Sequence, residues 1–91
     1  MGGEEFVVVL PATGAAGAIE LAERLRTAIE QTHWDLRQVT ASFGVSTLGG
    51  ATTTAAQLIE TADKALYNSK HSGRNRVTAY DLEGLLRSQA A

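Results

Sequence analysis

Two groups of residues in this sequence have types and spacings that could do chemistry. The first is Gly2, Gly3, Glu4 and Glu5, which stand directly before an apolar run. Paired glycines let the backbone approach a bulky ligand, and carboxylates are the oxygen ligands that magnesium prefers. These residues therefore suit a nucleotide triphosphate with its metal. An acidic pair near the start of a chain is also commonly a solvated end, so spacing alone leaves both interpretations open.

The second group is Lys70 and Arg74, which are four residues apart and carry the opposite charge. If a helix persists that far, the two side chains lie one turn apart and can both contact phosphate, lysine as a point charge and arginine as a fork. Basic residues at the end of a helix also complement its macrodipole. The residues alone therefore allow either a phosphate clamp or an ordinary helix terminus.

Composition narrows the class of protein. The chain has 91 residues, of which 44% are hydrophobic and 20% are charged, which is enough for one domain. It has no cysteine, so disulfides and thiolate metal sites are excluded. The net charge of −2 argues against nucleic-acid binding, although residues 64–91 carry five basic and two acidic side chains. No apolar run is long enough to span a membrane, and we expect a cytoplasmic location.

Hydrophobic periodicity indicates alternating strands and helices. An apolar β-branched run closed by Pro11 is typical of a buried strand, and apolar residues at Ile19, Ala22, Leu25 and Ile29 have helical spacing. Residues Thr54 and Gln57 form a capping box, which predicts the start of a second helix. The expected elements are strands over 6–10, 38–47 and 77–80, helices over 15–31 and from 54 to about 72, and a short helix or disordered tail over 81–91.

These segments also resemble a known family. The sequence Gly2-Gly3-Glu4-Glu5-Phe6 followed by VVVLP resembles the signature of the GGDEF domain, the diguanylate cyclase family, with Glu4 where that family has Asp or Glu. Later segments resemble that family's later motifs in the same order: LAERLR at 21–26, VTASFGV at 39–45, ADKALYNSK at 62–70 and GRNRV at 73–77. The resemblance covers residues 2 to about 80.

The resemblance implies an α+β fold. The expected arrangement is a partial nucleotide-cyclase or ferredoxin-like core in the order β-α-β-α-β, with two helices on one face of a small sheet. Residues 1–80 would form the C-terminal half of a GGDEF domain, and residues 81–91 would form the short helix or tail.

The resemblance also implies an activity. In that family two domains, each holding GTP and Mg²⁺, face each other and join two GTP molecules into cyclic di-GMP with release of pyrophosphate. By position, Glu4 would be a metal ligand, and Glu5 would act close to the reacting 3′-hydroxyl or the metal. Gly2 and Gly3 would lie against the nucleotide, which Lys70 and Arg74 would hold by its terminal phosphates. The implied partners are GTP and a second GGDEF domain, in a homodimer.

The sequence starts at the signature, and this leads to three expectations. The family carries a metal-binding Asp and guanine-recognising Asn and Asp ahead of that point. We therefore expect weak or absent Mg²⁺ binding and no cyclase activity from this chain alone. The alternative is a non-catalytic GGDEF-like module that binds GTP, phosphate or a protein partner. The apolar strand over 6–10 would present an open edge, which predicts a strand-exchanged oligomer.

Overall fold

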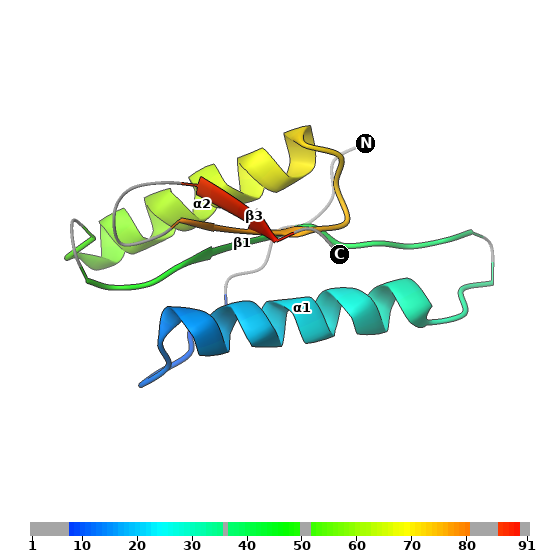
Figure 1. The fold of residues 1–91 in the computed structure, drawn as a ribbon, viewed down its shortest axis with the longest axis horizontal. Coiled ribbons are helices and arrows are strands. Elements are labelled where there is room, and N and C mark those ends of the chain that lie inside the picture. The colour runs from blue at the N-terminus through cyan, green and yellow to red at the C-terminus, as the bar shows by residue number, and fades with distance from the viewer. Residues whose placement is uncertain (1–7, 36, 50–51, 81–85, 90–91) are drawn as a thin grey trace.

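The structure, a computed structural model, describes residues 8–35, 37–49, 52–80 and 86–89. Its elements follow the order α1 (Ala15–Gln31), β1 (Phe43–Ser46), α2 (Ala55–His71), β2 (Val77–Tyr80) and β3 (Leu86–Gln89) (Figure 1). The predicted α+β class is confirmed. Both helices and the strand at Val77–Tyr80 have the predicted bounds to within a residue.

The sheet has the strand order β1-β2-β3. Strands β1 and β2 are parallel, with Phe43 opposite Val77 and Ser46 opposite Tyr80. A parallel pair needs a long crossover, and α2 supplies it. Strand β3 lies antiparallel to β2, with Leu86 opposite Tyr80. The predicted helix in the C-terminal segment is therefore wrong for Leu86–Gln89, because pairing with β2 satisfies its backbone in an extended form.

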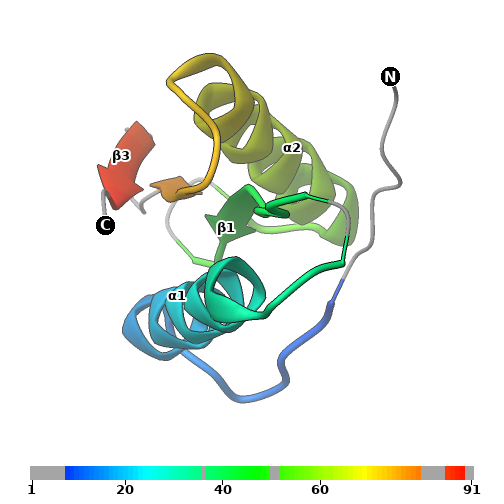
Figure 2. The same ribbon diagram turned by 90° about the vertical axis from the view of Figure 1, so that its right-hand side faces the viewer.

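The two helices lie on opposite faces of the sheet, whereas the resemblance predicted one face (Figure 2). Successive strand residues point to opposite faces. Val45 packs with Ala22 of α1, whereas a Cβ at Gly44 would collide with the α2 backbone at Ala62 and Leu66. Each face of the sheet would otherwise expose backbone and side chains to water, so one helix on each face buries both.

The α1 face holds the apolar core. It is formed by Ala22, Val45, Val77 and Ala79, with Ala18, Ile19 and Phe43 packed against them. The predicted apolar stripe of α1 is only partly correct. Leu25 is 43% exposed, while Arg26, one residue further on, is buried.

The α2 face is close-packed and polar. The hydroxyl oxygen of Ser69 lies 2.7 Å from both the carbonyl oxygen of Phe43 and the hydroxyl oxygen of Thr78, and its single proton can donate to either one. Thr78 in turn donates to the Asn68 side chain at 3.1 Å, and Ser46 donates to the Leu58 carbonyl at 2.7 Å. Ser69 and Thr78 are completely buried. Small residues let helix and sheet approach, and hydrogen bonds compensate for the buried hydroxyls.

Helix ends match the sequence pattern. The capping box at the start of α2 is present, with Thr54 accepting from the backbone of Gln57. Gly73, after the end of α2, has φ +123°, as expected for a glycine that terminates a helix.

Two predicted strands differ from the structure. The strand over 38–47 is shorter, spanning only Phe43–Ser46. For the strand over 6–10, Phe6 and Val7 lie outside the described residues, and residues 8–10 are not in a strand. Val8 and Val9 are 69% and 74% exposed. A strand needs a neighbour, and no described strand pairs with this segment.

Candidate phosphate-contacting site

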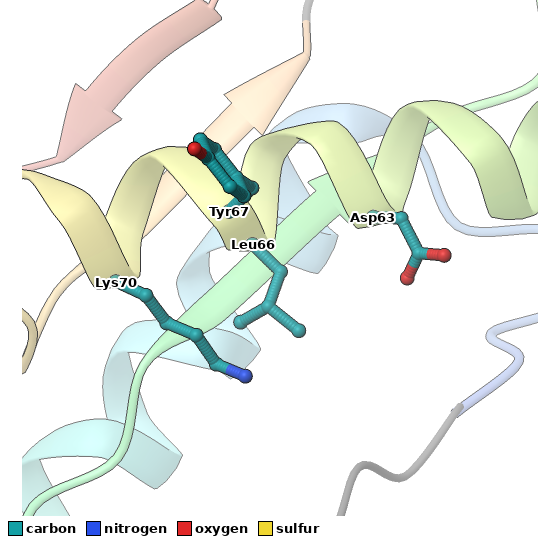
Figure 3. A pocket seen from close by; sticks show the side chains of 4 residues that line it. All are labelled: Asp63, Leu66, Tyr67 and Lys70. Carbon is teal, nitrogen blue, oxygen red and sulfur yellow. The ribbon is translucent and has the colours of Figure 1, made fainter.

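Lys70 lies in the last turn of α2 and lines a pocket of about 170 Å³. The other residues that line this pocket are Asp63, Leu66 and Tyr67. The side chains of Asp63, Leu66 and Lys70 extend to one side of the helix (Figure 3). Their spacing of three and four residues places them in one row along the helix. The pocket therefore has a cation at one end and a carboxylate at the other.

Arg74 does not continue this row. Helix α2 ends at His71, and the chain then takes positive φ values at Gly73 (+123°), Arg74 (+61°) and Asn75 (+49°). The condition for placing Lys70 and Arg74 one helical turn apart is therefore not met. The turn instead brings Arg74 out from the end of α2, where its side chain is exposed.

Backbone groups of this turn are already occupied. The N–H of Arg74 donates to the Ser69 carbonyl at 2.9 Å, and the N–H of Asn75 donates to the Ser42 hydroxyl at 3.1 Å. Consecutive backbone N–H groups in a turn can form an anion-binding nest, but these two have partners within the protein. An anion here would therefore be contacted by side chains of Lys70 and Arg74.

A buried polar network supports the same turn. Arg26 of α1 is 4% exposed, and its Nη1 donates to Oδ1 of Asn75 at 2.9 Å. Asn75 Nδ2 donates to Oε2 of Glu30 at 2.9 Å. The hydrogen bond with Glu23 raises the pKa of Arg26, and the charge and hydrogen bond of Glu30 act in the same direction. The guanidinium is therefore a fixed positive charge beneath the turn.

This network was not among the features predicted from the sequence. One local signal was present, because Arg26 falls four residues after Ala22 on the apolar stripe of α1. An arginine at a core position indicates a buried partner, since a charge is rarely buried without one. The partner Asn75 is distant in sequence, and no local pattern identifies it.

The signature residues Gly2, Gly3, Glu4 and Glu5 lie outside the described residues. Their predicted roles in catalysis, nucleotide binding and metal binding therefore stay predictions. Within the described ranges, no group of three or more His, Cys, Asp or Glu side chains is placed to hold a metal ion. The described residues also include no helix long and apolar enough to cross a membrane.

The sequence matches one known protein family. The model of the family "Diguanylate cyclase, GGDEF domain" matches residues 1–76. The chain belongs to the GGDEF family. The match includes both the signature and the turn that carries Arg74, so the GGDEF residues proposed from the sequence fall within it.

Relatives of this GGDEF chain include three bacterial proteins. Diguanylate cyclase A of Treponema denticola is 47% identical over 81 residues, which cover 85% of this chain and 22% of that protein. The response regulator PleD of Caulobacter vibrioides is 40% identical over 82 residues, covering 84% of this chain and 18% of PleD. Diguanylate cyclase DgcP of Pseudomonas aeruginosa is 41% identical over 80 residues, which cover 84% of this chain and 12% of DgcP. The GGDEF chain thus spans 22% or less of the length of each of these three relatives. No solved structure gave a significant match.

Proposed function

We propose that this chain contributes the phosphate-contacting part of a GTP site in a diguanylate cyclase. The observation that carries the proposal is the family match over residues 1–76, which contains two cations, Lys70 and Arg74, at the end of α2. The two relatives named above as diguanylate cyclases align with 85% and 84% of the chain. The partners in the proposed reaction are GTP and a second GGDEF domain.

The proposed chemistry is attack of a 3′-hydroxyl on an α-phosphate with pyrophosphate as the leaving group. Negative charge builds up on the leaving group in such a reaction, and fixed cations near it lower the barrier. Lys70 supplies a compact charge and Arg74 a planar fork that can contact two oxygens. Glu4 and Glu5 act at the reacting end, and Gly2 and Gly3 lie against the nucleotide. Glu4 is also the proposed ligand of Mg²⁺.

Pyrophosphate binding to the 91-residue chain tests the cation clamp. We expect weak binding by titration calorimetry, with an affinity that falls as salt rises, because exposed charges are screened. The Lys70→Ala, Arg74→Ala double variant should lose this binding. Lys64→Ala is the matched control, because Lys64 is an exposed lysine of the same helix, and it should bind as the wild type does. Equal losses in both variants would reduce the site to general basic charge and overturn the proposal.

Product formation tests catalysis separately. We propose that the 91-residue polypeptide alone forms no cyclic di-GMP from GTP and Mg²⁺. With Glu4 as its one proposed protein ligand, Mg²⁺ would bind weakly. Turnover that disappears in Glu5→Ala would contradict this expectation. Pyrophosphate binding without turnover would support the alternative of a non-catalytic module.

We also propose that the chain associates through a sheet edge. The predicted edge strand over 6–10 is not a strand at residues 8–10, so the proposal now rests on an edge of the described sheet. Strand β1 pairs on one side with β2, and no strand of the described residues lies on its other side. Unpaired backbone groups at such an edge can pair with another chain. Sedimentation at several concentrations should show an oligomer. A monomer at all concentrations would exclude strand exchange.

A further inference from the structure

The turn after α2 holds two consecutive non-glycine residues in the left-handed region. Arg74 has φ +61° and Asn75 has φ +49°. This conformation is uncommon for residues with a side chain and costs on the order of 1 kcal/mol or more each. It persists only where surrounding contacts determine it.

Asn75 is held from three directions. Its Oδ1 accepts from Arg26 at 2.9 Å, its Nδ2 donates to Glu30 at 2.9 Å, and its backbone N–H donates to Ser42 at 3.1 Å. The two side-chain bonds use opposite ends of the amide and go to residues one helical turn apart on α1. The amide can satisfy both only in one orientation, so α1 fixes the backbone at Asn75.

Arg26 is itself fixed. Its Nε donates to Glu23, its Nη1 also donates to Glu30 at 3.2 Å, and its Nη2 donates to Thr27 at 3.3 Å. A guanidinium with partners on every nitrogen cannot rotate without breaking several charge-assisted hydrogen bonds. The burial of Arg26 removes competing water. Arg26 is therefore a rigid hydrogen-bond partner on α1 for Asn75, the residue that follows Arg74 in the turn.

We propose that Arg26, Glu30 and Asn75 form a positioning network, which holds the backbone of Arg74 in the conformation from which its guanidinium contacts phosphate. This inference rests on the proposed phosphate clamp and extends it to residues of α1 that contact no substrate. Anchoring the turn lowers the ordering cost of binding, because Arg74 is already placed when the anion arrives. The network acts on affinity through Arg74 alone.

The variant Asn75→Gly separates positioning from folding. Glycine adopts positive φ without strain, so the turn can still form, but the bonds to Arg26 and Glu30 are lost. We expect pyrophosphate binding to weaken about 2- to 30-fold, the range of typical coupling energies. The same substitution in an Arg74→Ala background should weaken binding no further, because the network acts only through Arg74. An equal loss in both backgrounds would overturn the proposal.

Conservative variants and a ligand-free measurement complete the test. Glu30→Gln keeps an acceptor for Asn75 and should bind pyrophosphate better than Glu30→Ala, while Glu20→Gln at an exposed position of α1 is the control. The three-bond HN–Hα coupling of Arg74, which reports φ, should change in Asn75→Gly. An unchanged coupling overturns positioning even if binding falls. Absence of pyrophosphate binding to the wild type overturns the clamp instead, and the coupling still decides whether the network fixes the turn.

Discussion

The two faces of the sheet are packed by different physical means. On the α1 face, Val45, Val77 and Ala79 form an apolar core with Ala22. On the α2 face, buried hydroxyls bond to each other and to backbone carbonyls, and the strand contributes Gly44 where the helix passes closest. The stability of the apolar face depends on how well side chains fill the volume between α1 and the sheet. The polar face depends on distance and on satisfied hydrogen bonds, which makes it less tolerant of substitution.

The two faces also contribute differently to the support of Lys70 and Arg74, the two cations of the proposed site. Lys70 belongs to α2, and its helix is fixed to the sheet by hydroxyls of Ser69 and Thr78. The turn that carries Arg74 is bonded from both sides of the sheet. The N–H of Arg74 donates to the Ser69 carbonyl of α2, and Asn75 accepts from Arg26 of α1. The turn after α2 is therefore where the two supports meet.

Gly44→Ala should have the largest effect on stability. Its Cβ would collide with backbone atoms of Ala62 and Leu66, which cannot move aside as a flexible side chain could. We expect a loss of about 3 kcal/mol or more in the free energy of unfolding, at the upper end for overpacked sites. Urea denaturation measures it.

Gly17→Ala is the matched control for that change. Gly17 lies inside α1, where a Cβ would meet only the Thr13 side chain at 3.1 Å. Alanine favours the helix over glycine, so this variant should be stabilised by about 0.5–1 kcal/mol if the Thr13 side chain can move slightly. A Gly44→Ala protein as stable as the wild type would show that α2 is not held at close approach.

A pair of swaps at neighbouring positions compares the faces directly. Val77 and Thr78 are both fully buried and point to opposite faces. Val77→Thr places a hydroxyl among apolar side chains, and Thr78→Val removes the partner of Ser69 and Asn68. Each should cost about 1–3 kcal/mol, because Val77→Thr buries a hydroxyl in apolar surroundings and Thr78→Val leaves the Oδ1 of Asn68 without the hydroxyl that donates to it. Thr78→Val is decisive, since hydrophobicity alone predicts stabilisation.

Local sequence patterns predicted the elements well. Helical spacing located α1, the capping box at Thr54 located the start of α2, and β-branched residues located Val77–Tyr80. These signals work because each depends on neighbours a few residues apart. The C-terminal leucines at helical spacing were misleading, because pairing with β2 determines the structure of Leu86–Gln89.

Features that depend on distant contacts were not predicted. The placement of helices on opposite faces follows from Gly44 and Thr78, which have polar or small side chains and were not recognisable as core. Lys70 and Arg74 were identified as candidates by charge, but the turn that separates them is determined by Arg26 of α1. The roles of Lys70 and Arg74 stay predictions from the sequence, whereas the network of Arg26 and Asn75 could be found only in the fold.

The starts of the two helices give the smallest predicted effects and extend the comparison beyond the sheet. Helix α2 begins in a capping box at Thr54, whereas Gly14 at the start of α1 makes no side-chain cap bond. Thr54→Ala should cost about 1 kcal/mol, because the N–H of Gln57 loses its acceptor. Gly14→Ser should instead gain about 0.3 kcal/mol, since a Cβ there meets no atom within 4 Å and serine can accept from the helix. Thermal unfolding of both variants measures the difference. If neither variant changes the melting temperature, the helix starts fray before the sheet faces separate. Neither cap would then contribute to the cooperative unfolding of the core.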